Sequence, residues 1–320
     1  MRLLITGGAG FIGSNFIRYI LNKYPSYKII NLDKLTYAGN PDNLKDIAKN
    51  QNYTFIRGDI CDSKNVGKAI KGCDCLVNFA AATHVDRSIK DASDFVRTNV
   101  YGTYALLEAA RAARLKRFIQ ISTDEVYGSV LKGKSKETAA LLPNSPYAAT
   151  KAAGDCLVRS YFITYKLPVM ITRSSNNFGP YQYPEKVIPL FITNLLENKK
   201  VPLYGDGLNR RDWLYVLDNC RAIDLILHKG ERGGIYNIGS GNEITNAALT
   251  KKILKLMKKP GSFIQYVKDR PGHDRRYALD SAKLKSLGFR PEFTFSRALG
   301  LVVDWYRNNP HWWRKLKKPF

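Results

Sequence analysis

The sequence predicts an α/β protein with a doubly wound parallel sheet and a smaller, interleaved C-terminal lobe. Short apolar runs rich in β-branched residues alternate with longer helical patterns from residue 2 to about residue 175. Strands that are separated by helices in this way form βαβ units and a parallel sheet. A glycine-rich turn directly follows the first apolar run, as it does in Rossmann-type sheets that bind dinucleotides.

Six runs are expected to form the strands of this sheet. In chain order they are Leu3–Thr6, Lys28–Asp33, Thr54–Arg57, Cys75–Phe79, Arg117–Ser122 and Pro168–Arg173. Right-handed crossovers place helices on both faces of such a sheet, and ligands bind outside the carboxyl ends of its strands. The loops that follow these strands are therefore expected to carry the functional residues.

The sequence changes in character after about residue 175. Prolines, glycines and tyrosines gather in Gly179–Pro184, and shorter elements with long loops follow. Trp213–Val216, a helix from Leu217 and Ile235–Ile238 are apolar enough to return to the main sheet. We expect a cofactor-binding domain over residues 1–175, completed by residues of about 213–240, and a substrate lobe over residues 176–320.

The composition is that of a folded and strongly basic protein. Lys and Arg number 51 and Asp and Glu 27, so the formal net charge is +24, which favours anionic ligands, acidic partners or polyanion surfaces. No apolar run approaches the roughly 18 residues of a membrane-spanning helix, and no signal peptide is recognisable. The 5 cysteines form no paired zinc or disulfide pattern, which predicts a cytoplasmic location and no metal.

The segment Trp312–Phe320 differs from the other basic stretches because its cations alternate with aromatic residues. Such a mixture can contact a membrane surface or nucleic acid. A C-terminal segment that docks on its own domain or stays mobile is the commoner arrangement. Both interpretations stay open from the sequence.

The glycine-rich turn has the pattern of a cofactor phosphate site. Gly7, Gly8, Gly10 and Gly13 lie between the first strand and a helix. Glycines permit close backbone approach, and the helix N-terminus offers free N–H groups and a partial positive charge to a pyrophosphate. Asp33 ends the second strand 20 residues after Gly13, where a carboxylate can bind the ribose hydroxyls of the cofactor.

Asp33 favours NAD over NADP, because a 2′-phosphate would meet its negative charge. The adjacent Lys34 opposes this preference. Asp59 and Ile60 follow the third strand and are placed to line an adenine pocket. The alternative interpretation of Asp33 is a helix-capping or solvated aspartate.

Tyr147 and Lys151 are 4 residues apart and share one face of a predicted helix. Asn144 or Ser145 caps this helix, and Pro146 lies in its first turn. The ammonium and the helix dipole predict a lowered tyrosine pKa, so that Tyr147 can take a proton from a hydroxyl group. The Tyr-x-x-x-Lys spacing alone is unspecific in a chain with 19 tyrosines.

The strand before that helix ends in Ser122, Thr123, Asp124 and Glu125. One interpretation is a loop or capping pair of acids. At the carboxyl end of a central strand beside Tyr147 and Lys151, a catalytic acid and base are favoured instead.

These motifs together resemble the nucleotide-sugar branch of the extended short-chain dehydrogenase/reductases, and within it the dTDP-glucose 4,6-dehydratases. The resemblance covers nearly the whole chain. Its most discriminating motif is Thr123–Glu125, because related epimerases need no acid pair, while decarboxylases and GDP-mannose dehydratases typically keep only the glutamate. The other matching segments are Phe79–Asp86, Thr98–Asn99, Tyr147–Lys151, Arg173–Gln182, Arg211–Val216 and Asp269–Tyr277.

The resemblance implies dehydration of dTDP-glucose to dTDP-4-keto-6-deoxyglucose, with NAD bound throughout. Tyr147, helped by Lys151 and Thr123, would deprotonate the 4-hydroxyl while NAD takes the C4 hydride and later returns it to C6. Glu125 would remove the C5 proton, and Asp124 would protonate the departing C6 hydroxyl. Opposite roles for adjacent carboxyls require environments that separate their pKa values.

The resemblance, together with the residues above, gives two sets of binding residues. The cofactor set is Gly7, Gly10, Phe11, Ile12, Gly13, Asp33, Lys34, Leu35, Thr36, Asp59, Ile60, Phe79, Ala80, Ala81, Thr98, Ser122, Tyr147, Lys151 and Asn177. The substrate set is Thr83, Thr123, Asn176, Lys186, Val187, Pro202, Tyr204, Arg211, Asn237, Arg270 and His273. Arg211 suits a diphosphate because a guanidinium makes paired bonds to phosphate oxygens, although Asp212 is an available ion-pair partner. His84 is expected to be structural.

The resemblance also implies a homodimer joined through the helices that contain Thr98–Arg111 and Tyr147–Tyr161. Two rival functions are a different nucleotide-sugar epimerase, dehydratase or decarboxylase, and an NAD-sensing module that binds nucleic acid through its basic surface. An epimerase or decarboxylase would leave Asp124 without a task. A sensing module would leave the coincidence of Tyr147, Lys151 and the acid pair unexplained.

Overall fold

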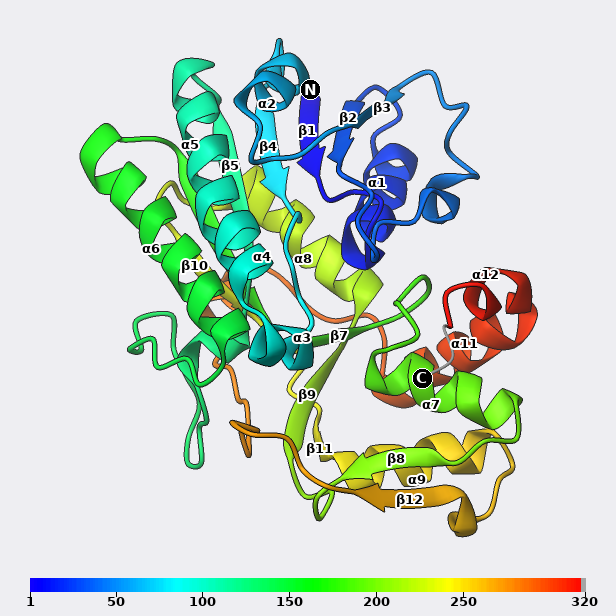
Figure 1. Ribbon diagram of the computed structural model, residues 1–320. Coiled ribbons are helices and arrows are strands. Elements are labelled where there is room, and N and C mark those ends of the chain that lie inside the picture. Colours follow the sequence, from blue (N-terminus) through cyan, green and yellow to red (C-terminus); the bar gives the residue numbers. More distant parts are fainter. Residues whose placement is uncertain (318–320) are drawn as a thin grey trace.

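A seven-stranded parallel sheet forms the centre of the computed structural model, which describes residues 1–317 (Figure 1). Its strand order is β3-β2-β1-β4-β5-β6-β10, and every neighbouring pair is parallel. The chain reverses its direction of travel across the sheet between β1 and β4. A crevice for a ligand is expected at such a switch point, outside the carboxyl ends of the strands.

The predicted strands agree with the observed ones to within one residue at each end. The strands of the main sheet are β1 (Arg2–Thr6), β2 (Lys28–Asp33), β3 (Tyr53–Arg57), β4 (Cys75–Asn78), β5 (Arg117–Thr123), β6 (Val169–Ser174) and β10 (Ile235–Ile238). Successive side chains of β1 point to opposite faces, so Leu3 and Ile5 pack in one apolar cluster and Leu4 in another. Both faces of the sheet are therefore buried, as parallel sheets require.

Helices cover both faces (Figure 1). Those of this domain are α1 (Phe11–Lys23), η1 (Pro41–Leu44), α2 (Ser63–Ile70), α3 (Val85–Lys90), α4 (Ser93–Phe95), η2 (Val96–Tyr101), α5 (Gly102–Ala112), η3 (Asp124–Tyr127), α6 (Pro146–Tyr165) and α8 (Val216–Lys229). The helices α1 and α8 pack together on one face, and α2, α5 and α6 pack on the other. Ser145 caps α6 through the backbone N–H of Ala148, as the sequence predicts.

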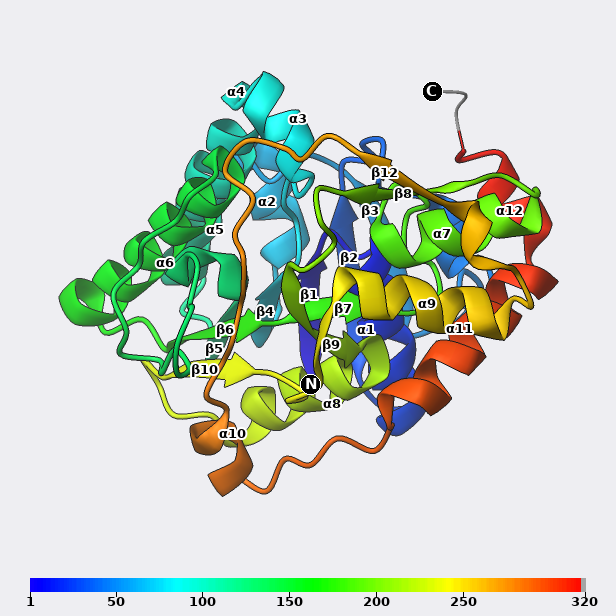
Figure 2. The same ribbon diagram turned by 90° about the horizontal axis from the view of Figure 1, so that it is seen from below.

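The second lobe lies beyond the carboxyl ends of the main strands, and Figure 2 shows it from below. It contains two small sheets, with the order β11-β9-β7 in one and β12-β8 in the other. Its elements are β7 (Asn176–Phe178), α7 (Val187–Leu196), β8 (Val201–Tyr204), β9 (Arg210–Tyr215), β11 (Glu243–Thr245), α9 (Asn246–Leu256), η4 (Gly261–Phe263), β12 (Ile264–Val267), α10 (Ala282–Ser286), α11 (Phe295–Asn308) and α12 (Pro310–Arg314).

The expectation that Trp213–Val216 joins the main sheet is wrong. Residues up to Tyr215 form β9, which pairs with β7 and β11 in the second lobe. The carboxylate of Asp212 accepts hydrogen bonds from the backbone N–H groups of Ser240 and Asn242, which fastens β9 to the segment leading into β11. The helix expected from Leu217 and the strand Ile235–Ile238 do return to the main domain.

The aromatic-basic segment that begins at Trp312 docks on the protein as far as the structure describes it. Trp312 and Trp313 are buried, and Lys315 and Lys317 form ion pairs with Asp42 and Glu197. The interpretation as a docked segment is thus confirmed for residues 312–317. Lys318, Pro319 and Phe320 lie outside the described residues. Among residues 1–317, no helix has the length and apolarity needed to cross a membrane.

The buried ion pair between Asp155 of α6 and Arg173 of β6 generates a stability prediction. The Arg173 Nε donates to Asp155 Oδ2 over 2.9 Å, and both side chains are almost fully shielded from water. Asp155→Ala should lower the free energy of unfolding by about 3–5 kcal/mol, because it leaves an uncompensated buried charge. Asp304→Ala, which removes an exposed pair with Arg307, should change it by less than about 1 kcal/mol. Equal losses in urea unfolding would contradict this difference.

Candidate active site

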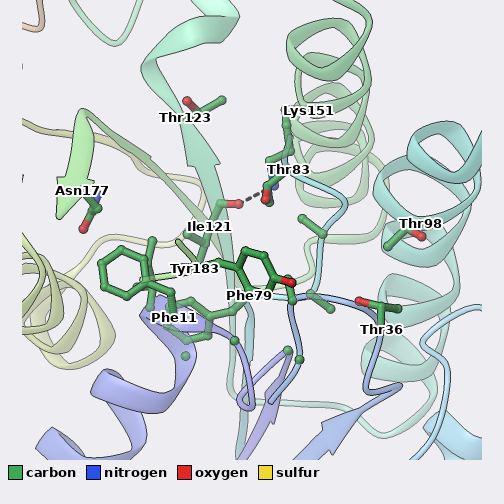
Figure 3. Close-up of a pocket in the computed structure, with 18 of the residues that line it drawn as sticks. Phe11, Thr36, Phe79, Thr83, Thr98, Ile121, Thr123, Lys151, Asn177 and Tyr183 are labelled. Atoms are coloured by element: carbon green, nitrogen blue, oxygen red, sulfur yellow. Dashed lines mark hydrogen bonds between the residues drawn. The ribbon is translucent and has the colours of Figure 1, made fainter. Parts of the chain in front are cut away.

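A cavity of about 320 Å³ opens at the carboxyl ends of the main strands. It begins at the glycine-rich turn after β1 and extends past β5 and α6 to Lys186, directly before α7. Figure 3 shows Phe11, Phe79 and Tyr183 at one side of it and Thr123 and Lys151 at another. One continuous space therefore joins the predicted cofactor loop to the predicted catalytic residues.

The glycine-rich turn is shaped by steric limits at two positions. Gly7 has a φ of +69°, and a Cβ there would lie 2.5 Å from the backbone nitrogen of Ala80. A Cβ on Gly13 would lie 2.5 Å from the carbonyl oxygen of Gly7. Any side chain at either position would push the turn away from β4 or from the first turn of α1, so only glycine fits.

The N-terminus of α1 fits a pyrophosphate. Within residues 1–317, no side chain caps this helix at Gly10, and its first turn contains no acidic residue. The N–H groups of that turn and the positive end of the helix dipole thus face the cavity without a competing anion. The turn therefore fits the phosphates of a dinucleotide.

Asp33 sits between the glycine-rich turn and the following loop. Its Oδ2 accepts a hydrogen bond from the N–H of Ala9 over 2.9 Å, and its Oδ1 accepts one from Leu35 over 2.8 Å. Burial raises the pKa of this carboxyl, and the two backbone donors counteract the rise. The adjacent Lys34 pairs with Asp59 Oδ2 over 2.9 Å. Because Asp59 offsets the positive charge of Lys34, this charge opposes the preference of Asp33 for NAD over NADP less strongly.

A π-helical turn, η2, builds the wall next to Ala80 and Ala81. Thr98 lines the cavity, while the Asn99 side chain donates to the carbonyl of Ala82 and accepts from its N–H. Asn99 also donates to Thr150 of α6 over 3.0 Å. Turns of this kind are frequent at functional sites, and here one asparagine fixes the loop after β4 against the catalytic helix.

Tyr147 and Lys151 face the cavity from the first two turns of α6. Lys151 Nζ donates to the carbonyl oxygen of Ile121 over 2.6 Å, the bond drawn in Figure 3. Burial lowers the pKa of Lys151 to about 8.

The expectation of a lowered tyrosine pKa is wrong for the protein alone. Burial is the largest cause, and the negative charges of Glu125 and Asp124 add to it, so the pKa of Tyr147 is raised. A hydrogen bond with Thr123 acts in the opposite direction but is smaller. The loss of water and the acids that follow the neighbouring strand thus outweigh the helix dipole and the ammonium of Lys151, from which the lowered pKa was expected.

Asp124 and Glu125 begin η3 immediately after β5. Burial raises the pKa of Asp124 well above its usual range, and the charge of Glu125 raises it further. Thr123 Oγ1 donates to Asp124 Oδ1 over 3.2 Å, while no described residue bonds to the buried Oδ2. Its surroundings therefore favour the protonated form of Asp124, which can donate a proton.

Glu125 has a different environment from its neighbour. Burial raises its pKa too, but the positive charges of Arg270, Arg211 and Lys186 lower it. The two carboxyl groups therefore have different surroundings, as opposite acid and base roles require. The same three cations make this end of the site suitable for an anionic ligand.

The cations come from different elements and are held individually. Arg211 of β9 lies 4.2 Å above the Tyr277 ring and donates to the carbonyl oxygen of Asp274 over 2.8 Å. It has no bond to Asp212, whose carboxylate is used by Ser240 and Asn242. The alternative of an Arg211–Asp212 ion pair is thus wrong.

Arg270 and Lys186 are held by single contacts. Arg270 pairs with Asp86 of α3 over 3.1 Å and keeps a buried Nε without a partner among residues 1–317. Lys186 Nζ donates to the carbonyl oxygen of Thr83 over 3.2 Å. Donors thus stay available on Arg270 and Lys186 in addition to their positive charge.

The structure brings together most residues that the sequence predicts. All of the predicted catalytic residues line the cavity, as do Thr83, Asn176 and Lys186 of the substrate set. The cofactor set lines it too, except for Leu35, whose backbone N–H instead binds Asp33. Tyr204, Arg211, Arg270 and His273 lie outside the cavity. His273 Nδ1 is 2.6 Å from Asp269 Oδ1, and its ring meets the Tyr204 ring edge-on at 6.3 Å.

Three further predicted substrate residues, Val187, Pro202 and Asn237, also lie outside the cavity. Val187 begins α7 beside Lys186, and Pro202 lies in β8. Asn237 is fully buried in β10, where it accepts from Tyr127 and donates to the carbonyls of Ser135 and Asp280. Its polar atoms are all used within the protein, so the structure gives Asn237 a packing role.

The cavity also has lining residues that the sequence analysis did not assign. They are Leu32, Ala38, Gly39, Gly58, Ile121, Ser174, Ser175, Tyr181, Gln182, Tyr183 and Glu185. Ser174, Ser175, Tyr181 and Gln182 belong to the matching segment Arg173–Gln182, so the sequence did mark this region as part of the site. Ala38 and Gly39 follow a strand by several residues and carry no distinctive chemistry, so no signal in the sequence marks them.

The comparisons with known proteins agree with this geometry. The family model described as GDP-mannose 4,6 dehydratase matches residues 4–300. The chain belongs to this family. A relative in Streptomyces niveus named dTDP-glucose 4,6-dehydratase is 52% identical over 100% of this chain and 96% of its own length. The resemblance recognised in the sequence is thus confirmed.

Solved structures extend the comparison within the GDP-mannose 4,6 dehydratase family and its neighbours. A dTDP-glucose 4,6-dehydratase from Streptomyces venezuelae, crystallised with NAD, has a TM-score of 0.97 and 50% identity and covers 99% of this chain and 100% of its own. A UDP-glucose 4-epimerase from Thermus thermophilus in complex with NAD has a TM-score of 0.90 and 32% identity, with coverage of 97% and 100%. The fold is thus shared with epimerases.

His84 generates a pH prediction that separates a structural histidine from a base. Burial, aided by the charge of Lys186, lowers its pKa from 6.5 to about 4. Between these values the unfolded chain binds a proton that the native protein does not, so stability is lost as pH falls through this window. His84→Asn should reduce that loss by up to roughly 3 kcal/mol in urea unfolding. Parallel stability curves for the two proteins would show that His84 is not held neutral.

Proposed function

We propose that this protein is an NAD-dependent dTDP-glucose 4,6-dehydratase, which converts dTDP-glucose to dTDP-4-keto-6-deoxyglucose and water. The observation that carries the proposal is the acid pair. Asp124, whose pKa is raised by burial, and Glu125, whose pKa is lowered by the charges of three cations, share one cavity with Tyr147 and Lys151. The full-length similarity to the Streptomyces niveus enzyme supports the same reaction.

The residues of the cavity fit NAD. The uncapped N-terminus of α1 would hold the pyrophosphate, Asp33 the ribose hydroxyls, and Asp59 and Ile60 the adenine side. When bound, NAD would accept the hydride from C4, return it to C6, and place a positive ring charge that favours the phenolate of Tyr147.

The protein's own residues would move the protons. Tyr147 accepts the proton of the 4-hydroxyl, and the ammonium of Lys151 stabilises the phenolate. Oxidation at C4 acidifies the proton at C5, which Glu125 removes. Asp124 protonates the 6-hydroxyl, which leaves as water, and a proton returns to C5 in the product.

Arg211, Arg270 and Lys186 are proposed to bind the diphosphate of the substrate. Their charges all act on Glu125, so they surround the end of the site beyond the acid pair. A bound diphosphate would offset part of this positive charge and thereby strengthen Glu125 as a base.

An epimerase on the same fold is the alternative, since the Thermus thermophilus neighbour is one. Epimerisation needs no general acid for a departing hydroxyl, so it would leave the buried, protonated Asp124 without a function. Incubation with dTDP-, UDP-, CDP- and GDP-hexoses in deuterated water separates the two. A product lighter by one water with deuterium at C5 supports the dehydratase, and an isomer of unchanged mass overturns it.

The cytoplasmic location and the homodimer also stay proposals. The exposed faces of η2, α5 and α6 carry large apolar side chains, each about half exposed, namely Val96, Tyr101, Tyr104, Ile163 and Tyr165. These elements pack side by side. Large exposed apolar side chains on neighbouring helices are typical of a protein interface, and these lie on the helices expected to form the dimer.

Asp124→Ala should uncouple the two halves of the reaction. Tyr147 and Lys151 stay in place, so the C4 ketone should still form, while loss of the C6 hydroxyl slows by about 100- to 10,000-fold. Rapid acid quench and mass spectrometry should find a 4-keto sugar nucleotide that keeps its 6-hydroxyl. The control Tyr147→Phe should form neither this species nor product. Release of 6-deoxy product at the wild-type rate by Asp124→Ala would remove Asp124 from the mechanism.

Turnover should fall as the pH rises through about 8. The reason is the pKa of Lys151, which burial lowers to about 8, so that the ammonium is present below this pH and lost above it. A kcat profile from pH 6 to 10 measures the effect, and Lys151→Met should be slow and lack this alkaline decline. A wild-type kcat that stays constant to pH 10 would contradict the role of the ammonium.

Tyr104→Glu should weaken self-association by placing a charge in the exposed apolar face. Analytical ultracentrifugation should show a dimer for the wild-type protein and a shift toward monomer for the variant. Tyr266→Glu is the matched control, because Tyr266 is exposed in β12 of the other lobe. A monomeric wild-type protein, or equal behaviour of the two variants, would overturn the proposed interface.

A further inference from the structure

The C-terminal helix α12 is linked to the glycine-rich turn by two successive hydrogen bonds. Helix α12 lies next to α11, and Figures 1 and 2 show both at the edge of the molecule near α7. Trp312 of α12 donates its indole N–H to Asn43 Oδ1 over 2.8 Å. Asn43 in turn donates through Nδ2 to the carbonyl oxygen of Ala9, in the glycine-rich turn, over 2.8 Å.

The two hydrogen bonds from Trp312 through Asn43 to Ala9 form a relay that requires a particular side chain in the middle. The indole nitrogen can only donate and the carbonyl oxygen can only accept, so the residue between them must offer one acceptor and one donor. The side-chain amide of Asn43 does both, and its residue is 1% exposed. Because the relay is withheld from water, loss of either bond leaves a buried polar group without its partner.

The relay meets the turn at Ala9, both of whose backbone polar groups are hydrogen-bonded. The N–H of Ala9 binds Asp33, and its carbonyl oxygen accepts from Asn43 and from the backbone N–H of Asn40 over 3.0 Å. Asn40 and Asn43 belong to the same loop that supplies Thr36, Ala38 and Gly39 to the cavity. The two sides of the nucleotide site are thus tied together through Asn43.

The same helices also contact Tyr181 and Gln182, two further residues that line the cavity. Tyr181, which lines the cavity, has a φ of +66° and meets the rings of Trp305 and Trp312 at 4.8 and 5.8 Å. A left-handed backbone conformation is unfavourable for a tyrosine, so these contacts help to maintain it. Tyr306 donates to the carbonyl oxygen of Gln182, another lining residue.

We propose that Trp312 and Asn43 are positioning residues through which α12 fixes the glycine-rich turn, and that they thereby set the affinity for NAD. The inference rests on the proposed function, since it takes NAD as the ligand of that turn. Trp312 and Asn43 do not line the cavity, so they act through Ala9 and Tyr181.

The chain supplies a matched control. Trp313 is also buried, and its indole N–H donates to the carbonyl oxygen of Tyr306 over 2.7 Å. Trp312→Phe and Trp313→Phe therefore remove the same atoms and a similar buried hydrogen bond. Only the first removes the link to the glycine-rich turn, so a general loss of stability is common to both and cancels in the comparison.

The test measures NAD binding to each full-length protein by calorimetry, with thermal unfolding recorded alongside. Trp312→Phe and Asn43→Ala should each weaken NAD binding by roughly five- to tenfold, as expected for one lost buried hydrogen bond. The double variant should add little to either single change, because both break the same relay. Trp313→Phe should stay within about twofold of wild type. Asn43→Ala keeps all aromatic packing and serves alone if Trp312→Phe does not fold.

Hydrogen exchange without any ligand separates this inference from the proposed function. The amides of residues 7–13 should exchange faster in Trp312→Phe than in wild type and should be unchanged in Trp313→Phe. Equal effects of the two tryptophan variants on exchange and NAD affinity, or none from Trp312→Phe, would overturn the positioning role. If wild type binds no NAD, the proposed function and the claim about affinity both fail, while the exchange data still decide whether the relay fixes the turn.

Discussion

The burial of two adjacent carboxyl groups is the constraint on which the rest of this site depends. Asp124 and Glu125 follow one another at the end of β5, and burial raises the pKa of both. Two neighbouring buried carboxylates cannot both keep their charge at low cost. Burial favours the protonated form of Asp124, while the positive charges of Lys186, Arg211 and Arg270 favour the carboxylate of Glu125.

This division of the acid pair accounts for the interleaved architecture. The sheet supplies Asp124, Glu125, Tyr147 and Lys151 from β5 and α6, but the cations that act on Glu125 all come from residues after 175. The second lobe must therefore be held at a fixed distance from the first. The return of α8 and β10 to the main domain and the pair between Arg270 and Asp86 provide that connection.

Much of the fold and the cofactor site could be predicted because local pattern and function coincide there. Each main strand is a short apolar run, and the glycines lie where only a missing side chain permits the contacts of Gly7 and Gly13. Trp213–Val216 was misassigned because an apolar run does not reveal its partner: the carboxylate of Asp212 and the turn at Ser240 decide that pairing. Asn237 was misplaced for a similar reason, since its bonds to Tyr127, Ser135 and Asp280 are all long-range. The pKa of Tyr147 depends on desolvation, which has no local signature.

The contact between α12 and the loop after β2 bears on the order in which the protein is made. The glycine-rich turn and Asn43 leave the ribosome early, whereas α12 spans Pro310–Arg314 and is synthesised after the other elements of both lobes. During synthesis the turn can fold against β1 and β4, but the amide of Asn43 must first bond to water instead of Trp312. The proposed support of the nucleotide site by Trp312 is therefore added only after α12 has been synthesised.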